Sequence, residues 1–112
     1  MNKAQRNKNP VNLRFAGQHE AVGKDDDGFA IFPNDPAGWR AAHAQIELDQ
    51  GRGLTLEQFI SKFAPPSEND TKNYLRFVAL QLLVKPEVEL NLLSKYALAG
   101  AMARMEGYFN KD

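Results

Sequence analysis

The sequence predicts a mainly α protein: a compact helical domain with about four helices and one small extended or β-like element. The first observation is size, because 112 residues with 43% hydrophobic and 25% charged side chains suit one ordinary globular domain. The second is that apolar residues recur every three or four positions in stretches separated by proline and glycine. The third is a short segment, 28–32, in which bulky and small side chains alternate.

The N-terminal part of the chain is polar and gives the weakest structural signals. Residues 1–8 carry no hydrophobic periodicity, which predicts a mobile N-terminal arm ahead of a single domain over residues 9–112. Segment 28–32 has the sequence GFAIF and stops at Pro33, which cannot continue a strand ladder. We therefore expect a short strand or extended segment there.

The first long helix is expected to begin at Asp35 and Pro36. A carboxylate there caps free backbone amides, and proline suits the first helical position. Trp39 and Ile46 follow at helical spacing. The Gly-Arg-Gly sequence at 51–53 predicts the end of this helix.

A second, shorter helix follows directly. Thr55 and Gln58 have the spacing of a capping box, and Phe59 and Phe63 continue an apolar face from there. Residues 64–66 are Ala-Pro-Pro, and they must end the helix because proline disfavours a helical conformation in its predecessor.

Two further helices complete the predicted fold. Ser67 or Asn69 is expected to cap the third helix, which the Lys-Pro pair at 85–86 ends. Ser94 is expected to cap the last helix, and Gly107 is a plausible stop.

The apolar faces of these helices predict one contiguous core. Gly100 lies inside the last helix, where glycine costs about 1 kcal/mol relative to alanine, so it suggests a close helix contact. The large side chains expected in the core are Trp39, Phe59, Phe63, Tyr74, Phe77, Leu82, Tyr96 and Met102.

Composition argues against several classes of function. Fourteen basic and fourteen acidic side chains balance, which disfavours a nucleic-acid binder. The chain has no cysteine, and neither His19 nor His43 has a second ligand at metal-binding spacing, so we expect no metal and no cofactor. No apolar run is long enough for a membrane span, and the charged N-terminus lacks the apolar core of a secretory signal.

Glu106 is a candidate general acid. It lies near the end of the last helix, where a carboxylate opposes the negative end of the helix dipole. Neighbouring apolar and aromatic residues, such as Met105 and Tyr108, could desolvate it and raise its pKa, as cleavage of a glycosidic bond requires. The alternative is a surface glutamate paired with Arg104 or Lys111.

A second candidate is the polar segment that precedes the third helix. Glu68 and Asp70 supply carboxylates there, beside the amide of Asn69 and the hydroxyl of Thr71, and Tyr74 follows one turn later. The same residue types are also what a capped helix start requires, so a purely structural role is open as well.

Several motifs resemble a family of small phage and prophage domains, often described as virion structural proteins, and the resemblance covers about residues 8–108. These domains are similar to murein-lytic virion proteins of the lysozyme-like, lytic transglycosylase class. Val11 departs from the pattern, since the family has glycine at the third position of its Asn-Pro motif. The motifs are Asn9–Phe15, Gly28–Phe32, Gly38–Ala41, Phe63–Tyr74 and Met105–Gly107.

The resemblance implies a lysozyme-like fold whose parts are circularly permuted, with the glutamate-bearing helix last. It implies that Glu106 is the catalytic acid, with Asp70 and Glu68 as candidates for a second carboxylate. It also implies that the following residues line a glycan groove: Asn9, Asn12, Arg14, Asn69, Thr71 and Tyr74.

The expected reaction is cleavage of the bond between N-acetylmuramic acid and N-acetylglucosamine in peptidoglycan. A lytic transglycosylase needs only the glutamate, because the muramyl 6-hydroxyl attacks the cationic centre. A lysozyme needs a second carboxylate, about 5 Å away for retention or about 6.5–9.5 Å away for inversion.

The expected partners are peptidoglycan strands and other virion proteins, without nucleic acid or membrane, and we expect a monomer. The expected location is the virion or the host cytoplasm, from which the protein would need delivery to the periplasm. The rival hypothesis is a non-catalytic virion structural or interaction protein that keeps the fold. A small DNA-associated regulator is disfavoured by the balanced charge.

Overall fold

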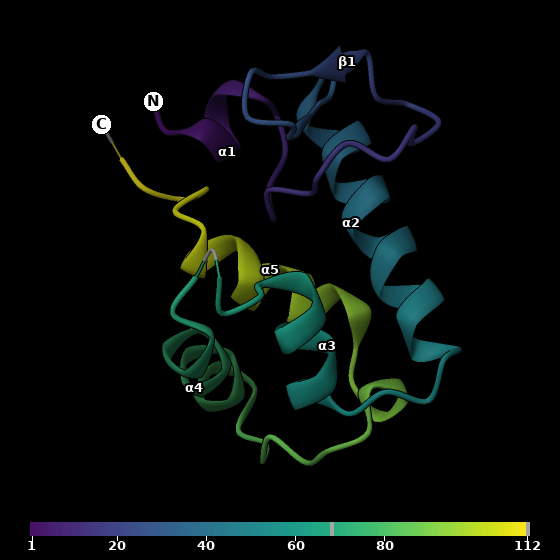
Figure 1. Cartoon of the computed structure of the whole chain (residues 1–112), viewed down its shortest axis with the longest axis vertical. Coiled ribbons are helices and arrows are strands. Elements are labelled where there is room, and N and C mark those ends of the chain that lie inside the picture. Colours follow the sequence, from purple (N-terminus) through teal and green to yellow (C-terminus); the bar gives the residue numbers. More distant parts are fainter. Residues whose placement is uncertain (68, 112) are drawn as a thin grey trace.

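The structure, a computed structural model, describes residues 1–67 and 69–111 and confirms a mainly α domain with a small sheet (Figure 1). Its principal extents are 35, 30 and 25 Å. The long helices gather in the lower and right-hand parts of Figure 1, and the N-terminal segments cover their upper end. In chain order the elements are α1 (Lys3–Arg6), β1 (Gly23–Lys24), β2 (Ala30–Ile31), α2 (Asp35–Gln50), α3 (Leu56–Phe63), α4 (Thr71–Leu82), the 3-10 helix η1 (Leu90–Leu92) and α5 (Lys95–Met105).

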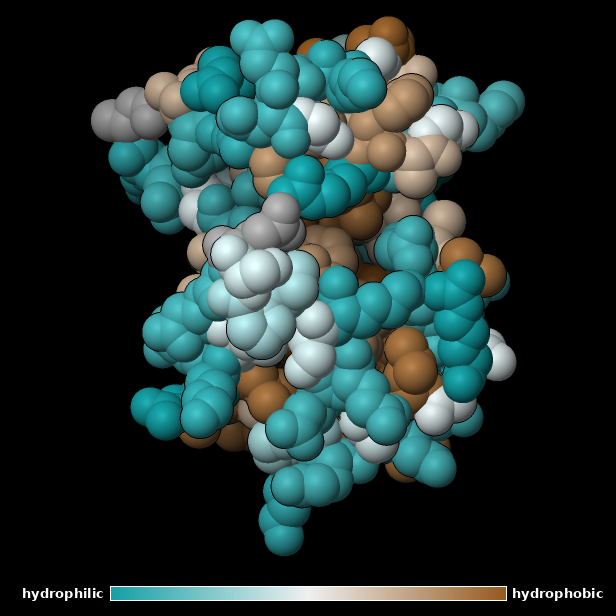
Figure 2. Space-filling model, in the orientation of Figure 1, coloured by the Kyte–Doolittle hydropathy of each residue, from teal (hydrophilic) through white to brown (hydrophobic). Residues whose placement is uncertain are grey.

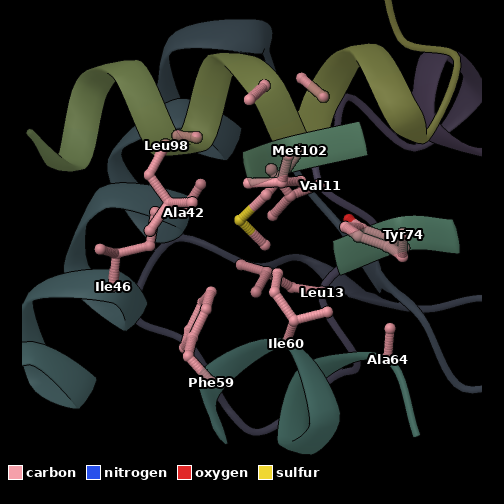
Figure 3. Packing of buried hydrophobic residues seen from close by; sticks show 14 of the residues in the cluster. Val11, Leu13, Ala42, Ile46, Phe59, Ile60, Ala64, Tyr74, Leu98 and Met102 are labelled. Carbon is pink, nitrogen blue, oxygen red and sulfur yellow. The ribbon is translucent and has the colours of Figure 1, made fainter. Parts of the chain in front are cut away.

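Helix α5 is the centre of the helical packing. It packs against both α2 and α4, and α3 packs against α4. Figure 3 shows the side chain of Met102 in the space between these helices, with Leu98 and Val11 around it. Ala99, Ala101 and Ala103 are also buried, so small side chains let the neighbouring helices approach α5 closely.

Most of the large side chains expected in the core are there. Phe59, Tyr74 and Met102 are buried, while Trp39, Phe63, Phe77 and Leu82 are partly buried against the same cluster. The prediction is wrong for Tyr96, which is 64% exposed. Its ring lies on the surface against His43, with the ring centroids 4.7 Å apart, because the first turn of α5 extends beyond the core.

The helix starts agree with the sequence to within a few residues. Thr55 caps α3 in a full capping box with Gln58, and Ser94 caps α5, as predicted. Helix α2 is capped by Asn34, one residue before the predicted Asp35, because the Asn34 side chain reaches the Ala37 amide. Helix α4 is capped by Asp70, later than predicted, because its carboxylate accepts from the Asn73 amide.

The predicted strand over 28–32 is shorter in the structure. Ala30 and Ile31 form β2, which pairs antiparallel with β1. Phe29 instead forms an isolated bridge with Arg14, which attaches the segment after residue 9 to the hairpin. Asp25 organises the turn, since its carboxylate accepts from the amides of Asp27 and Phe29.

The N-terminal eight residues differ from the mobile arm that the sequence predicts. They include α1, in which Ala4 is fully buried. Asn2 donates to the carbonyl of Gly107 at 2.7 Å, and Gln5 donates to the carbonyl of Asn110 at 2.6 Å. The two chain ends therefore lie side by side (Figure 1). Polar contacts of this kind leave no hydrophobic periodicity in the sequence.

The close approach predicted at Gly100 is absent, because a Cβ atom added there would meet nothing within 4 Å. The close approach occurs at Gly38 in α2 instead. A Cβ at Gly38 would lie 2.0 Å from the backbone oxygen of Lys8 and 2.8 Å from Cδ of Pro10. Gly38 therefore allows the N-terminal segment to lie directly on α2.

These two glycines give a matched pair of substitutions. We expect Gly38→Ala to lower the free energy of unfolding by at least about 2 kcal/mol, because backbone must move to make room. We expect Gly100→Ala to raise it by about 0.5–1 kcal/mol, because alanine is the better helix former and finds open space. Urea unfolding of both variants measures this, and equal effects would contradict the assignment of the close contact.

The capping box of α3 predicts a smaller loss. Thr55→Ala removes the acceptor for the Gln58 amide and should lower the free energy of unfolding by about 1 kcal/mol. Thr55→Ser keeps the hydroxyl and serves as the control. Equal midpoints for Thr55→Ala and the parent in urea would show that the cap contributes nothing.

Candidate active site

Glu106 lies directly after α5, at the point where the helix ends. Its own amide closes the last turn on the carbonyl of Met102. Its carboxyl group is held from two sides: Nδ2 of Asn12 donates to Oε1 at 2.9 Å, and the hydroxyl of Tyr74 donates to Oε2 at 2.7 Å. The three residues come from three distant parts of the chain, so only the folded protein assembles them.

The surroundings of Glu106 favour its protonated form. Burial raises the pKa of the carboxyl group, and it outweighs the hydrogen bonds from Asn12 and Tyr74 and the charge of Lys3, which all lower it. Burial and the neighbouring carboxyl group raise the pKa of the Tyr74 hydroxyl, so Tyr74 stays a donor. A raised carboxyl pKa is a shift in the direction that general acid catalysis requires.

Asn12 reaches Glu106 because its backbone has the left-handed conformation, with φ of 54°. Asparagine tolerates this conformation better than most residues. Valine at position 11, where the resembling family has glycine, is compatible with this geometry. Val11 is not among the residues with positive φ, and its side chain is buried in the core.

A cleft of about 670 Å³ opens beside Glu106. Figure 2 shows the surface hollowed at mid-height, between the N-terminal part of the chain and the helices below it. The volume is within the usual range for ligand sites, about 300–1,000 Å³. The lining residues are Asn2, Lys3, Asn12, Leu13, Arg14, Ala16, Gln18, Phe29, Gln45, Asp49, Lys62, Phe63, Ala64, Asn69 and Glu106.

The structure brings some of the nominated site residues to this cleft. Glu106, Asn12, Arg14 and Asn69 line it. Tyr74 is only 3% exposed, and its hydroxyl donates to Oε2 of Glu106. It therefore positions the acid without lining the cleft itself.

The other nominated residues lie elsewhere. Asn9 is fully buried, and its amide group bonds the backbone of Leu13 and Ala30. Asp70 caps α4, and the Thr71 hydroxyl donates to the carbonyl of Ala64 at 2.6 Å. Neither lines the cleft, so the structure gives both a role in holding the start of α4. Glu68 lies outside the described residues.

Sequence reasoning missed a second carboxylate in the cleft. Asp49, in the last turn of α2, is 1% exposed and bonds Lys62 at 2.6 Å, Arg52 at 2.7 Å and Gln45 at 2.9 Å. Burial alone would raise the pKa of Asp49, but hydrogen bonds from these three partners hold the pKa below its usual value. The signal that singled out Glu106, an acid at a helix C-terminus, applies equally to Asp49.

Comparison with known proteins relates the chain to a phage protein. The chain is 32% identical over 115 residues to Protein P5 of Pseudoalteromonas phage PM2, an alignment that covers 94% of this chain and 71% of that protein. The chain belongs to the family of this phage protein. No family model matches the sequence. Within residues 1–67 and 69–111, no helix is both long enough and apolar enough to cross a bilayer.

Tyr74→Phe tests how the acid of this P5-family chain is tuned. The substitution removes a hydrogen-bond donor that lowers the pKa of Glu106. The pKa of Glu106 should therefore rise further. The measurement is an NMR titration of the Glu106 carboxyl carbon in both proteins. Tyr96→Phe is the matched control, because it removes a hydroxyl group from an exposed ring at the other end of α5, and it should leave the titration nearly unchanged.

The raised pKa of Glu106 also predicts a pH-dependent difference in stability. Its ionisation is harder in the folded state, so this group favours the folded protein below its unfolded pKa, near 4.5, and that contribution is lost as pH rises through the raised value. Glu106→Gln cannot ionise and should gain stability relative to the parent over that window. Urea unfolding from about pH 4 to about pH 8 tests this, and a constant difference would contradict it.

Proposed function

We propose that this protein cleaves the glycosidic bond between N-acetylmuramic acid and N-acetylglucosamine in peptidoglycan, as a lytic transglycosylase with Glu106 as its acid. The observation that carries the proposal is the placement of Glu106: partly buried, held by two donors and open to a cleft. Asn12, Tyr74 and Glu106 belong to the motifs that resemble murein-lytic virion domains, and here they form one contact. In this proposal the fold is a permuted lysozyme-like one.

The reaction needs one proton donor that later accepts a proton. Protonated Glu106 gives its proton to the glycosidic oxygen as that bond to C1 of the muramyl residue breaks, which releases the N-acetylglucosamine hydroxyl. The muramyl 6-hydroxyl then attacks C1 and returns its proton to the Glu106 carboxylate. The product is a 1,6-anhydro end, and no water is consumed. Asn12 and Tyr74 stabilise the carboxylate between the two steps.

The carboxylates of the described cleft favour this mechanism over hydrolysis. Besides Glu106, the lining includes only Asp49, whose Oδ1 atom is shared by Lys62 and Arg52. A carboxylate paired in this way is a poor nucleophile or base. Asp70, nominated for the lysozyme mechanism, is bound to the start of α4. A transglycosylase does not require either group.

Membership in a phage protein family fits an enzyme carried by the virion or made in the host late in infection. An enzyme in the virion would reach the periplasm with the infecting particle and would have other virion proteins as partners. An enzyme made in the host would need separate delivery to the cell wall.

The decisive experiment compares two acids in the same chain on purified sacculi. Glu106→Gln should lower the rate of glycan release by about 10²-fold or more, because it removes the general acid. Asp70→Asn keeps a side chain that can cap α4 and should retain most of the activity. Mass spectrometry of the products should show 1,6-anhydromuramyl ends.

Three results would redirect the proposal. Reducing ends in place of anhydro ends would indicate a lysozyme. Loss of activity in Asp70→Asn without loss of stability would return Asp70 to the reaction. Undiminished release by Glu106→Gln, or no release by the parent protein, would favour the rival function, a non-catalytic virion structural or interaction protein.

A further inference from the structure

The cleft contains a polar cluster that the proposed reaction does not use. Asp49 lies on its floor and binds two other lining residues: Lys62 donates to Oδ1 and Gln45 donates to Oδ2. A buried carboxylate is costly, and replacing such a charge pair by apolar residues is often neutral or stabilising. Burial at a helix C-terminus adds to that cost. Core packing therefore does not account for Asp49.

The effect of Asp49 is to fix Lys62 at the cleft. The Lys62 side chain is half-exposed, and its ammonium group lies 2.6 Å from Oδ1 of Asp49. An ammonium group has three donors, and one bond to Asp49 leaves two for other acceptors. Because Asp49 is already shared with Arg52, the pair does not neutralise both cations. Lys62 therefore presents positive charge to the cleft from a fixed position.

Further cations lie on the opposite wall. Lys3 and Arg14 line the cleft, and both lie over the ring of Phe29, at 4.0 and 4.6 Å from its centroid. Lys3 also pairs with the carboxylate of Asp27 at 3.3 Å, so the inference rests on Lys62.

The lining residues come from different parts of the fold, and Lys62 in α3 lies on another element than Glu106, which follows α5. Glu106, Asn2 and Lys3 come from the chain ends, whereas Asp49 and Gln45 come from α2, on the other side of the molecule in Figure 1. A glycan whose scissile bond lies at Glu106 would extend along the cleft toward Lys62. In a peptide-bearing strand the lactyl carboxyl group of each muramic acid is an amide, so the carboxylates of the strand are those of the peptide stems.

We propose that Lys62, positioned by Asp49, binds a carboxylate of the peptide stem, so that the cleft selects peptide-bearing strands over bare glycan. This inference rests on the proposed function for its substrate and adds the group that is recognised. Lys62 touches the ligand, and Asp49 is a positioning residue that acts through Lys62.

The test measures binding separately from catalysis. Isothermal titration calorimetry uses the Glu106→Gln protein, which cannot turn substrate over, with a muramyl disaccharide–tetrapeptide and with the same disaccharide whose lactyl carboxyl group is capped as a methylamide, so that the second ligand has no carboxylate. We expect the peptide-bearing ligand to bind about tenfold more tightly, as one charge-assisted hydrogen bond allows. Adding Lys62→Met should remove this preference, and Lys62→Arg should keep part of it.

Arg52→Met is the matched control, because Arg52 bonds the same oxygen of Asp49 but does not line the cleft. It should keep the preference, whereas Asp49→Asn should reduce it by releasing Lys62. Thermal unfolding followed by circular dichroism checks that each variant is folded. Equal affinity for the two ligands, or an equal loss of preference in Arg52→Met and Lys62→Met, would overturn the proposal. Failure of the proposed function would show separately, as absence of anhydro ends from the parent protein.

Discussion

The buried amide of Asn9 is the interaction on which the rest of the site depends. Its Nδ2 donates to the carbonyls of Leu13 and Ala30, and its Oδ1 accepts from the Leu13 amide. One side chain therefore closes a tight loop over residues 9–13 and attaches that loop to β2. Within this loop Asn12 must adopt a left-handed conformation, which directs its side chain to Glu106. A buried amide satisfied on both its atoms specifies one geometry, because any other would leave polar atoms unpaired.

Two carboxyl groups at helix C-termini show how the same fold shifts pKa values in opposite directions. Glu106 has two neutral donors, and burial raises its pKa. Asp49 is more deeply buried, yet two cations and an amide hold its pKa low. The difference comes from the partners and not from the depth of burial. Environments that push two carboxyl pKa values apart in one cleft are typical of sites that use one acid in each state. In this cleft the Asp49 carboxylate holds the Lys62 ammonium group in place.

The sequence predicted what depends on local chemistry. The capping box at Thr55, the cap at Ser94 and the apolar faces of the helices each involve residues within a turn or two of one another. It did not predict contacts between polar groups far apart in the chain. Gln5 with Asn110 is one such contact, and the close packing of the Lys8 backbone on Gly38 was not predicted either. Glu106 could be nominated because a resemblance and an unfavourable helix position coincided. Asp49 had the second signal alone, and its partner Lys62 lies on another helix, so only the structure revealed it.

The joined chain ends explain how a short protein holds an acid beside an open cleft. Gly107 follows Glu106 with φ of 82°, a conformation that glycine adopts without strain, and turns the chain back on itself. Asn2 donates to the carbonyl of Gly107 and also lines the cleft. The segment after the acid is thus held by residues that precede the fold's first long helix. Lys3, next in sequence, is close enough to oppose the rise in the Glu106 pKa. The N-terminal residues therefore affect Glu106 in two ways: Asn2 fixes the backbone that follows it, and the charge of Lys3 lowers its pKa. Helix α1 is thus part of the site.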